Sequence, residues 1–371
     1  MKAVVLVGGE GTRLRPLTYT TPKPLLPVAN IPFLERQLAW LAHHGVDEVV
    51  LSMGYLPDAF VTHFPGGRFG SVTLRYAVED EPLGTAGGIR FAAEQGGIDE
   101  RVVVCNGDVL TGLDLGELLR FHIDRDADAT IHLAQVPDPS AYGLVTTTTT
   151  GEVEAFVEKP PPGEAPTDWI NAGTYVLEPS VLDRIPEGAP SSIERETFPA
   201  LLREPGRLYA LQSDEYWIDV GTPEKYLEAH ADLLGGCLGP SSRPADARQH
   251  TGTDVWVQAG AILEAGVIVD APVLIGRGSN VEAGARVTES VVGAGCTVAR
   301  DAGIVRSVLL DGARVDDSAR VVDSVIGPGA VVEAGASVSD VSVIGARAVV
   351  AAGTHEARAR VQLAGSHAPS S

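Results

Sequence analysis

An aliphatic residue recurs every six positions through the last third of the chain, and no other feature of the sequence restricts the possible folds as strongly. The first series is Val257, Leu263, Val269, Ile275, Val281 and Val287. After shifts of one residue, the period resumes at Val292, Val298 and Ile304, and later at Ile326, Val332 and Val338. A six-residue period is typical of a parallel β-helix, in which each three-sided coil uses about three hexads. We therefore expect residues 253–355 to form a left-handed β-helix of about five to six coils.

Residues 1–235 follow a different pattern, in which apolar strands alternate with amphipathic helices. Strands are predicted at residues 3–7, 48–52 and 101–105, and one of the helices at residues 31–45. This alternation predicts a parallel sheet that is covered on both faces. In the last third of this region the strands become short, which predicts an antiparallel extension of the sheet. The expected fold is a Rossmann-like α/β domain with a mainly parallel, mixed sheet.

Composition marks the borders of these two regions. Residues 236–252 are rich in Gly, Pro, Ser and Arg, so we interpret them as a linker. Residues 356–371 end in the sequence SHAPSS, and we expect this tail to be disordered. The expected domains are therefore residues 1–235, which would carry the chemistry, and residues 253–355, which would form the β-helix.

Net charge and cysteine usage argue against several classes of function. The formal net charge of −21 disfavours a nucleic-acid or anionic-membrane binder, since such partners need a basic face. No apolar stretch approaches the roughly 20 residues of a membrane span, and the first apolar run is too short for a signal peptide. The three cysteines are far apart and suggest neither a disulfide framework nor a zinc site. We expect a cytoplasmic protein without nucleic-acid or membrane partners.

The stretch from residue 3 to residue 27 carries the strongest local signal in the first domain. Its apolar strand runs directly into a loop that contains Gly8, Gly9, Gly11, Arg13, Arg15 and Lys23. Glycine lets backbone N–H groups close around phosphate oxygens, and arginine adds charge and fork-shaped donors. The loop matches neither the GxxxxGK[ST] nor the GxGxxG pattern. Since ligands of parallel sheets bind at the carboxyl ends of strands, we predict a nucleotide phosphate site here.

Two aspartates follow other strands of the same domain. Asp108 follows the apolar strand RVVVC in the turn NGD, and Asp219 follows the aromatic pair Tyr216-Trp217. Taken singly, each aspartate fits a cap or turn position as well. Beside a phosphate site, two carboxylates at strand ends suit Mg²⁺, which takes few protein ligands and completes its octahedron with water and substrate oxygens. We predict that Asp108 and Asp219 hold Mg²⁺.

A second anion site is predicted where the strand ending in Glu158 meets Lys159 and Pro160. The lysine could reach a second phosphate there, although a solvated Glu–Lys pair fits the sequence too. Asn171 starts the apolar strand INAGTYVL, and its amide suits either a sugar hydroxyl or a turn. The sequence contains no HExxH and no GxSxG motif, so neither a zinc hydrolase nor a serine hydrolase is indicated.

Several motifs, taken in order, resemble those of the nucleoside-diphosphate-sugar pyrophosphorylases. They are GGEGTRLRPLT, PKPLLPVANIPFLERQL, LGTAGGI, NGDVL, EKP, INAGTYVL and WIDVGTPEKY, followed by the hexapeptide repeats. The resemblance extends from Met1 to about residue 355 and is greatest to the bacterial mannose-1-phosphate guanylyltransferases, or GDP-mannose pyrophosphorylases. The opening motif and the sequences around Asp108 and Asp219 are specific for the superfamily, whereas the assignment of guanine and mannose depends on fewer features.

The resemblance implies an enzyme that joins a sugar 1-phosphate to a nucleoside triphosphate and releases pyrophosphate. Such a displacement depends on positioning and on neutralising charge. By similarity, the catalytic residues are Arg13, Lys23, Asp108, Lys159 and Asp219. The nucleotide-binding residues are Leu6, Gly8, Gly9, Gly11, Thr12, Arg13, Lys23, Glu79, Gly84, Thr85 and Asp108. The residues that bind the sugar phosphate are Gly143, Glu158, Lys159 and Asn171.

The resemblance also divides the work among these groups. Arg13 neutralises the β- and γ-phosphates and the leaving pyrophosphate, and Lys23 contacts the region of the α-phosphate. Asp108 and Asp219 hold Mg²⁺, the implied cofactor. Lys159 holds the phosphate of the incoming sugar. Glu158, Asn171 and the backbone of Gly143 face the sugar hydroxyls.

The choice of base can be argued from hydrogen-bond donors. Guanine presents N1–H and N2–H₂ side by side, and one carboxylate accepts both, whereas uracil or thymine would call for an amide. Glu79 and Glu81 precede the turn Leu83-Gly84-Thr85-Ala86, where this superfamily reads its base. We predict that Glu79 reads guanine. The resemblance implies that the substrates are GTP and mannose 1-phosphate.

Other interpretations fit parts of the sequence. The same chemistry with other substrates would give a glucose-1-phosphate thymidylyl- or uridylyltransferase. A non-catalytic homologue that senses nucleotide sugars should lack phosphate or metal groups, yet all five catalytic candidates are present. An acyltransferase in the β-helix would usually need a histidine base within the coils. None lies between Thr253 and Thr354, and we expect His250 and His355, just beyond these limits, to lie outside the coils. We expect the flat aliphatic ladders of the repeats to mediate assembly into a homo-oligomer.

Overall fold

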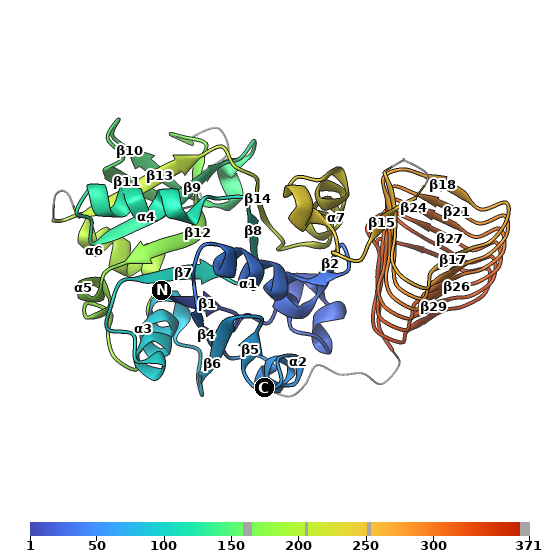
Figure 1. Ribbon diagram of the computed structural model, residues 1–371, viewed down its shortest axis with the longest axis horizontal. Coiled ribbons are helices and arrows are strands. Elements are labelled where there is room, and N and C mark those ends of the chain that lie inside the picture. Colours follow the sequence, from blue (N-terminus) through green and yellow to red (C-terminus); the bar gives the residue numbers. More distant parts are fainter. Residues whose placement is uncertain (159–164, 205–206, 251–253, 364–371) are drawn as a thin grey trace. The chain divides into compact units, whose positions relative to one another are not determined.

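The computed structural model describes residues 1–158, 165–204, 207–250 and 254–363 (Figure 1). The chain divides into two compact units. Unit 1 comprises Met1–Gly9 and Leu34–Trp217, and unit 2 comprises Glu10–Phe33 and Ile218–Ser371. These compact units do not coincide with the expected border at residue 235. Glu10–Phe33, which contains most of the phosphate-binding segment, and residues 218–235 group with the β-helix.

A mixed ten-stranded sheet forms the centre of unit 1, as the α/β prediction requires. The path β11-β10-β12-β7-β1-β4-β6-β5 carries most of its strands, and β9 joins β12 to β13. The parallel part consists of β1 (Lys2–Leu6), β4 (Glu48–Met53), β6 (Val72–Val78) and β7 (Val102–Asn106). The other strands are β5 (Arg68–Phe69), β9 (Ala129–Gln135), β10 (Gly143–Thr147), β11 (Val153–Glu158), β12 (Trp169–Leu177) and β13 (Leu208–Ser213). Strands β10, β11 and β12 pair antiparallel, which confirms the predicted extension.

Helices cover this sheet because its central strands are apolar throughout. In β1, Ala3, Val4 and Val5 have no exposed surface. Helix α3 (Gly84–Gly96) packs on β1, β4 and β6, and α4 (Leu115–Asp124) packs on β9, β12 and β13 (Figure 1). The other helical segments are α1 (Phe33–His43), α2 (Pro57–His63), η4 (Pro139–Ala141), α5 (Pro179–Leu182), the π-helical η5 (Ile193–Thr197) and α6 (Phe198–Leu201). None of the described helices is long and apolar enough to cross a membrane.

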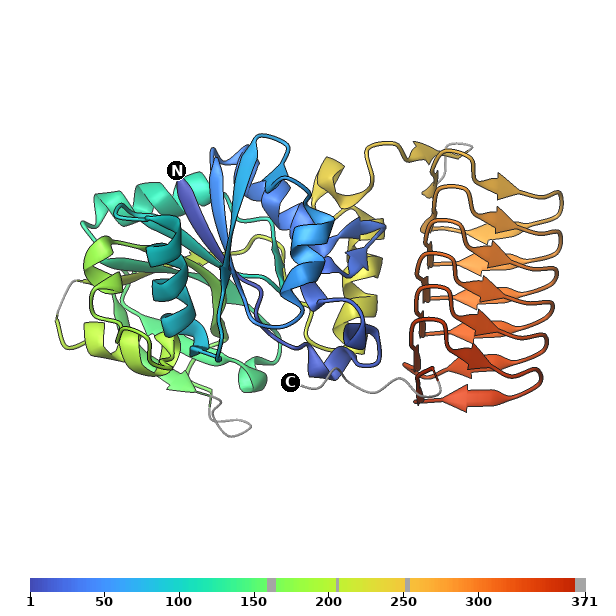
Figure 2. The same ribbon diagram turned by 90° about the horizontal axis from the view of Figure 1, so that it is seen from below.

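Three parallel sheets build the β-helix of unit 2, and its coils stack on one another (Figure 2). The first sheet contains β16, β19, β22, β25, β28, β31 and β34. The second contains β17, β20, β23, β26, β29 and β32, and the third contains β18, β21, β24, β27, β30 and β33. Their bounds, in chain order, are Val255–Val257, Ile262–Leu263, Ile268–Asp270, Val273–Ile275, Asn280–Val281, Arg286–Thr288, Val291–Val292, Thr297–Val298, Gly303–Val305, Val308–Leu309, Arg314–Val315, Arg320–Val322, Val325–Ile326, Val331–Val332, Ser337–Ser339, Val343–Ile344, Val349–Val350, His355–Ala357 and Arg360–Val361.

The aliphatic residues of the six-residue period fill the interior of these coils. Ile275, Val292, Leu309, Ile326 and Ile344 stack in the first sheet and have no exposed surface. Their neighbours in the other two sheets join the same core cluster. The predicted fold class, a Rossmann-like domain followed by a left-handed β-helix of hexapeptide repeats, is confirmed.

The repeats extend past the predicted end of the β-helix. Strand β33 pairs with β30, and β34 pairs with β31, so ordered coil continues to Val361. The predicted disordered tail, residues 356–371, therefore begins too early, and residues 364–371 lie outside the described part of the chain. His355 lies in β33, with Nδ1 2.6 Å from Ser337 Oγ. The expectation that His355 lies outside the coils is wrong, because the last coil needs this strand to cover the one before it.

The predicted linker contains regular structure as well. Strand β15 (Arg248–Gln249) pairs antiparallel with β16, and η6 (Gly239–Ser242) forms a short turn. Residues 251–253 are not described. The predicted linker therefore contains more regular structure than its Gly- and Pro-rich composition indicates.

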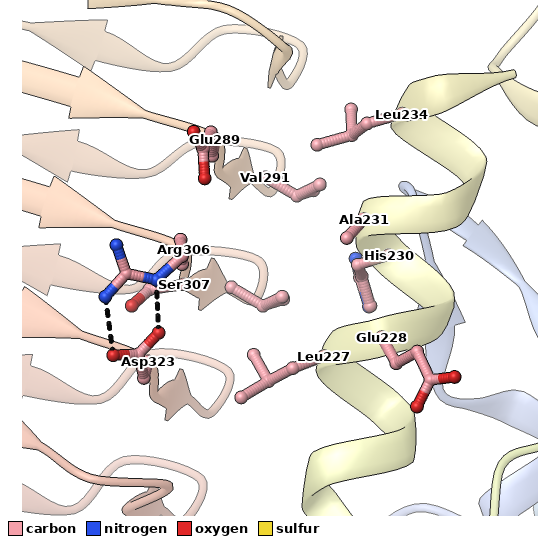
Figure 3. Close-up of a pocket in the computed structure, with 11 residues that line it drawn as sticks. Leu227, Glu228, His230, Ala231, Leu234, Glu289, Val291, Arg306, Ser307 and Asp323 are labelled. Atoms are coloured by element: carbon pink, nitrogen blue, oxygen red, sulfur yellow. Dashed lines mark hydrogen bonds and ion pairs between the residues drawn. The ribbon is translucent and has the colours of Figure 1, made fainter.

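One outer face of the β-helix is covered within unit 2. Leu274, Val291, Val308, Val325 and Val343 alternate with the interior ladder and so point outward, yet each is at most 2% exposed. Helix α7 (Pro223–Gly235) lies along this face (Figure 3). This aliphatic ladder is therefore not available for self-association.

Residues Glu10–Phe33 form three short turns and a hairpin in unit 2. Their bounds are η1 (Thr12–Leu14), η2 (Leu17–Tyr19), η3 (Lys23–Leu25), β2 (Pro27–Val28) and β3 (Ile31–Pro32). Leu14, Leu17 and Leu26 are buried and hold the turns together. The helix predicted from residue 31 begins only at Phe33, because the two preceding residues pair in the hairpin.

Candidate active site

Strands β1 and β7 end side by side in unit 1 and carry the first group of predicted site residues. They pair in parallel along their whole length. The N–H of Gly107 donates to the Leu6 carbonyl at 2.9 Å, and a Cβ on Gly107 would stand 2.6 Å from that oxygen. Only glycine fits this close approach. The resulting tight turn places the half-buried Asp108 directly beyond the carboxyl end of β7.

Gly8 and Gly9 leave the backbone accessible beyond the end of β1. A Cβ on Gly8 would lie 3.2 Å from the nitrogen of Gly54, just after β4, so Gly8 packs closely against its neighbour. Gly9 has no such contact within 4 Å. Bare backbone at a strand end is what a phosphate-binding turn requires, and the assignment of both glycines to the nucleotide stays a prediction.

The rest of the predicted phosphate loop lies in unit 2. Gly11 has a φ of 61°, in the left-handed region, and a Cβ there would lie 3.0 Å from Thr18 Cγ2. The Thr18 hydroxyl donates to the Gly11 carbonyl at 2.9 Å and closes the loop on itself. Thr12 and Arg13, which begin η1, are both exposed. The loop therefore presents these two predicted ligands outward.

The two arginines of this loop differ in their surroundings. Arg15 pairs with Glu10 at 2.5 Å and lies over the ring of Tyr19, 5.1 Å from its centroid. Arg13 lies over Gly221, where a Cβ would come within 2.7 Å of its guanidinium. Because Arg13 is exposed and Arg15 already neutralises a carboxylate, Arg13 is the more accessible of the two for an anionic ligand.

Lys23 and Asp219 meet in unit 2. Asp219 is the last residue of β14 (Trp217–Asp219), and its Oδ1 lies 3.7 Å from Lys23 Nζ. The side chain of Lys23 is 11% exposed and that of Asp219 is 25% exposed. The structure thus joins a predicted phosphate ligand to a predicted metal ligand at a partly buried position, where charges interact more strongly than in water.

The donor set suits a metal that relies on its substrate for part of its coordination. Within the described ranges, no three or more His, Cys, Asp or Glu side chains gather into a group that could hold a metal. Mg²⁺ commonly binds through one or two carboxylates plus phosphate oxygens and water. The assignment of Asp108, in unit 1, and Asp219, in unit 2, to Mg²⁺ stays a prediction.

A bulge in β12 shapes the predicted sugar-binding residues of unit 1. The register of β12 against β9 shifts between Asn171 and Tyr175, and Gly173 within it has a φ of 73°. Asn171 Nδ2 donates to the Tyr175 hydroxyl at 3.0 Å, and Asn171 Oδ1 accepts from Gly173 N–H at 3.1 Å. The amide of Asn171 is therefore oriented by the protein itself, with one N–H and one lone pair left for a ligand.

Glu194 connects this amide to the turn at the start of α3, a link that sequence reasoning missed. Its Oε2 accepts from the Thr85 hydroxyl at 2.8 Å and from the Ser192 hydroxyl at 2.9 Å, and its Oε1 lies 3.5 Å from the Tyr175 hydroxyl. Burial, and then the charge of Glu194, raise the pKa of Tyr175 well above its usual value, so its hydroxyl stays protonated. No motif pointed to Glu194, because Thr85 and Tyr175 lie 109 and 19 residues away in the sequence.

The three strands β10, β11 and β12 bring the other predicted sugar residues together. The register pairs Gly143 with Glu158 and Leu144 with Ile170, next to Asn171. Gly143, Glu158 and Asn171 thus belong to three neighbouring strands, as their predicted common role requires. Lys159 lies outside the described residues.

The predicted base-reading residues lie around the first turn of α3. This helix begins at Gly84, so the predicted turn Leu83-Gly84-Thr85-Ala86 is already helical after its first residue. Glu79 Oε1 accepts from the Ser52 hydroxyl at 2.7 Å, and Oε2 accepts from Leu83 N–H at 2.9 Å. The Thr85 hydroxyl accepts from Ile193 N–H at 2.9 Å in addition to its bond with Glu194. Both side chains therefore hold the turn itself, whatever they contact in a ligand.

Two of the three cysteines, Cys105 and Cys296, are buried. Burial raises the pKa of the Cys105 thiol, at the end of β7, to about 12. Burial raises the pKa of Cys296, in the β-helix, to about 12 as well. Both thiols thus stay protonated at neutral pH and are not activated as nucleophiles.

A cavity of about 220 Å³ lies within unit 2, between α7 and the covered face of the β-helix (Figure 3). Leu227, Ala231 and Leu234 form one wall, and an ion pair between Arg306 and Asp323 borders the other. The cavity contains none of the predicted site residues. Since its walls are the packing surfaces of α7 and the coils, we assign it no part in the chemistry.

Comparison with known proteins supplies the family. The family of nucleotidyl transferases matches residues 2–235, and the EIF2B subunit epsilon LbH domain matches residues 252–355. This chain belongs to the nucleotidyl transferase family. The family match contains every predicted site residue, from Leu6 to Asp219, and it confirms the resemblance seen in the motifs.

Curated relatives of this nucleotidyl transferase carry one activity in their names. Mannose-1-phosphate guanylyltransferase of Mycobacterium tuberculosis is 44% identical over 305 residues, which are 80% of this chain and 83% of that protein. Mannose-1-phosphate guanylyltransferase 1 of Arabidopsis thaliana is 38% identical over 306 residues, 81% of this chain and 84% of the relative. The matches extend over most of the relatives' length.

Solved structures also resemble this nucleotidyl transferase. HddC from Yersinia pseudotuberculosis, crystallised in complex with GMP-PN, is 30% identical with a TM-score of 0.54 over 62% of this chain and 99% of that chain. A putative glucose-1-phosphate thymidylyltransferase from Bacillus anthracis, in complex with a sucrose, is 25% identical with a TM-score of 0.57 over 62% of this chain and 94% of that chain.

Proposed function

We propose that this nucleotidyl transferase is a mannose-1-phosphate guanylyltransferase, which converts GTP and mannose 1-phosphate to GDP-mannose and pyrophosphate. The observation that carries the proposal is the 44% identity with the mycobacterial enzyme over 80% of the chain. The pairing of Lys23 with Asp219 and the tight turn before Asp108 support it, since both orient charged side chains of the kind that a phosphate substrate requires.

The proposed reaction is one displacement at the α-phosphorus of GTP. An oxygen of mannose 1-phosphate forms a bond to that phosphorus. The bond between the phosphorus and the oxygen bridging to the β-phosphate breaks, and pyrophosphate leaves with the electron pair. Because two polyanions must meet, the protein contributes mainly orientation and positive charge. Arg13 would bind the departing pyrophosphate, and Lys23 the α-phosphate.

Asp108 and Asp219 would hold the Mg²⁺ ion. When bound, Mg²⁺ neutralises phosphate charge and orients the oxygens around the reacting phosphorus. Asp219, whose carboxylate lies 3.7 Å from Lys23 Nζ, would supply one ligand, and phosphate oxygens and water would complete the coordination. Lys159 would bind the phosphate of the incoming sugar. Asn171 and Glu158, together with the backbone of Gly143, would bind the sugar hydroxyls.

Glu79 is the proposed reader of guanine, with Leu6, Gly84 and Thr85 beside it. Each Glu79 oxygen already accepts one hydrogen bond and retains a further lone pair, so the carboxylate can still receive N1–H and N2–H₂. Glu79→Gln should lose the preference for GTP over dTTP and UTP. Ser52→Ala removes the hydroxyl that supports the carboxylate and that also contacts the Gly88 carbonyl, and it serves as the matched control. An unchanged preference in Glu79→Gln would rule out this assignment.

The main test of the function is pyrophosphate release with a panel of substrates. GTP, dTTP and UTP are each combined with mannose 1-phosphate and glucose 1-phosphate. We expect the pair of GTP and mannose 1-phosphate to give the highest kcat/KM. The Bacillus anthracis structure favours glucose 1-phosphate and dTTP as the second candidate pair. Release with no pair would indicate a non-catalytic homologue that senses nucleotide sugars.

We also propose that the enzyme works in the cytoplasm as a homo-oligomer joined through its β-helix. The first sheet is covered by α7, so the two other outer faces are the candidates for the interface. Ile262 and Val349, both in the second sheet, are 58% and 52% exposed, which supports that face. Ile262→Glu combined with Val349→Glu should lower the mass measured by light scattering on the full chain. An unchanged mass would exclude this face.

A further inference from the structure

The hairpin β2–β3, which follows the phosphate-binding segment, ends in a buried tip. Ala29 and Asn30 at the tip have φ angles of 46° and 60°. Two successive left-handed residues form the tight turn that suits a two-residue hairpin. Ala29 and the preceding Val28 have no exposed surface. The contacts that bury this tip lie within unit 2.

Asn30 connects the tip to the β-helix through both hydrogens of its amide nitrogen. Nδ2 donates to the Val292 carbonyl at 2.9 Å and to Gln258 Oε1 at 3.1 Å. Gln258 Nε2 donates in turn to Asp246 Oδ1 at 2.9 Å, and Asp246 Oδ2 pairs with Arg277 at 2.7 Å. The acceptor of Asn30 is therefore itself held in place by further polar contacts.

Helix α7 holds the hairpin from another direction. The N–H of Ala29 donates to His230 Nδ1 at 3.2 Å, and the Tyr226 hydroxyl donates to the Pro27 carbonyl. The rings of Tyr226 and His230 meet edge to face at 4.7 Å and are 1% and 2% exposed. Because α7 lies on the covered face of the β-helix, both sets of contacts tie the hairpin to one framework.

Pro16 supplies a second attachment at the other end of the segment. A Cβ on Gly345, in the β-helix, would lie 3.0 Å from both Cβ and Cγ of Pro16. A side chain at position 345 would therefore press on the proline ring, so Gly345 favours this close contact. Lys23 lies in the chain between this attachment and Asn30, and Arg13 lies just before it. Both predicted phosphate ligands are thus on a segment that the β-helix touches twice.

We propose that the β-helix is the scaffold of the phosphate-binding segment and that Asn30 is the positioning residue that fastens it. The proposal rests on the proposed function for the identity of the ligand, a nucleoside triphosphate. Asn30 touches no substrate and acts through the backbone that carries Arg13 and Lys23. A misplacement of about 1 Å can lower turnover about a hundredfold, so a fastening at this point affects catalysis directly. The β-helix then serves the reaction as well as assembly.

Asn30→Gly is the decisive variant, because glycine keeps the left-handed turn and removes only the amide. Hydrogen exchange of the full chain without ligands tests the fastening independently of any activity. We expect amides in residues 10–33 to exchange about tenfold faster, since two hydrogen bonds are lost. Arg314→Ala is the matched control: it removes an ion pair with Asp316 in another sheet of the β-helix and should leave residues 10–33 unchanged.

Kinetics complete the test. In Asn30→Gly, kcat/KM for GTP should fall about tenfold while the melting temperature changes little, a combination that a loss of overall stability would not produce. Gln258→Ala removes one of the two acceptors and should give a smaller effect of the same kind, which keeps the test open if Asn30→Gly does not fold. Wild-type exchange in residues 10–33, or faster exchange with wild-type kinetics, would overturn the proposal. If the wild type releases no pyrophosphate, the proposed function fails, and the exchange result still decides the fastening.

Discussion

The Nζ atom of Lys23 lies 3.7 Å from Oδ1 of Asp219, so the end of the phosphate loop meets the end of β14. Each partner is partly buried, which makes their mutual attraction stronger than that of a surface pair. The lysine keeps the carboxylate oriented. A metal ion that binds the carboxylate lies beside the positive charge of Lys23, and a phosphate that binds Lys23 lies beside the negative charge of Asp219. The pair is therefore the most informative place at which to test the proposed chemistry.

Asp219→Asn should lower kcat about a hundredfold or more, because the amide keeps the size of the side chain and removes the charge that would hold Mg²⁺. Pyrophosphate release is measured over a range of Mg²⁺ concentrations, and the variant should need more Mg²⁺ for half-maximal activity. Asp214→Asn, at an exposed position nearby, is the control. A variant with the wild-type Mg²⁺ requirement would remove Asp219 from the metal site.

Arg13→Ala should reduce turnover more than it weakens binding of the sugar phosphate. The reason is that Arg13, exposed over Gly221, is assigned to the departing pyrophosphate and not to the incoming substrate. Steady-state kinetics with mannose 1-phosphate as the varied substrate separates kcat from KM. Arg15→Gln is the control, since its charge is already balanced by Glu10. A rise in KM without a fall in kcat would reverse the division of labour.

Gly107→Ala should impair both stability and activity. Its Cβ would lie 2.6 Å from the Leu6 carbonyl and 2.7 Å from Val7 Cγ1, so the turn that carries Asp108 must shift. Overpacking of this kind costs about 1–3 kcal/mol of unfolding free energy. Urea unfolding and pyrophosphate release are measured together. Gly235→Ala, where a Cβ meets nothing within 4 Å, is the control. Full activity in Gly107→Ala would show that Asp108 tolerates displacement.

Glu194→Gln should weaken the orientation of Asn171, because Glu194 accepts from Thr85, Ser192 and Tyr175 and an amide has only one accepting oxygen. We expect KM for mannose 1-phosphate to rise about tenfold, the cost of roughly one hydrogen bond to a charged group. Kinetics with varied sugar phosphate measures this.

Glu196→Gln provides the comparison for Glu194. Glu196 lies in the same π-helical segment and bonds to Ser191 and Ser192, without contact to Asn171 or Tyr175. Its KM for mannose 1-phosphate should stay near the wild-type value. Equal effects of the two variants would mean that both act only by loosening η5.

His132 should make stability depend on pH below neutrality. It lies in β9 with no exposed surface, neither ring nitrogen has a hydrogen-bond partner among the described residues, and burial lowers its pKa to about 4. Between about pH 6.5 and pH 4, the unfolded state therefore binds a proton that the folded state does not. As the pH is lowered through this range, the free energy of unfolding decreases by up to about 1.4 kcal/mol per pH unit. His132→Leu should flatten this dependence in urea unfolding series at pH 7, 6 and 5. An unchanged slope would assign the acid sensitivity to other groups.

The repeats and the strand ends could be predicted because their signals are local. The interior positions of the β-helix follow from the spacing of Ile275, Val292 and their equivalents, since each coil repeats the same requirement for an apolar residue. Asp108 could be placed beyond a parallel strand because an apolar run and a glycine turn precede it in the chain. Such features need no knowledge of distant residues.

Contacts between distant segments could not be predicted in the same way. Nothing near Asn30 indicates that its amide reaches Val292, and nothing near Glu194 indicates Thr85 and Tyr175. The start of α3 at Gly84 could not be predicted for the same reason. Gly84 lies against the carbonyl of Ser191, where a Cβ would stand 2.6 Å from the oxygen, and Ser191 is far away in the chain. Such pairings arise only when the elements pack.

The sequence by itself determined the two architectures, the phosphate-binding loop and the family, because periodicity, glycine turns and charged motifs are written in neighbouring residues. Only the tertiary structure decided that Glu10–Phe33 belongs to the same compact unit as the β-helix, that Lys23 faces Asp219, and that α7 covers one aliphatic ladder. The physical reason is that burial and hydrogen bonding select partners by proximity in space, and a single sequence does not state which of its many apolar and polar residues will meet.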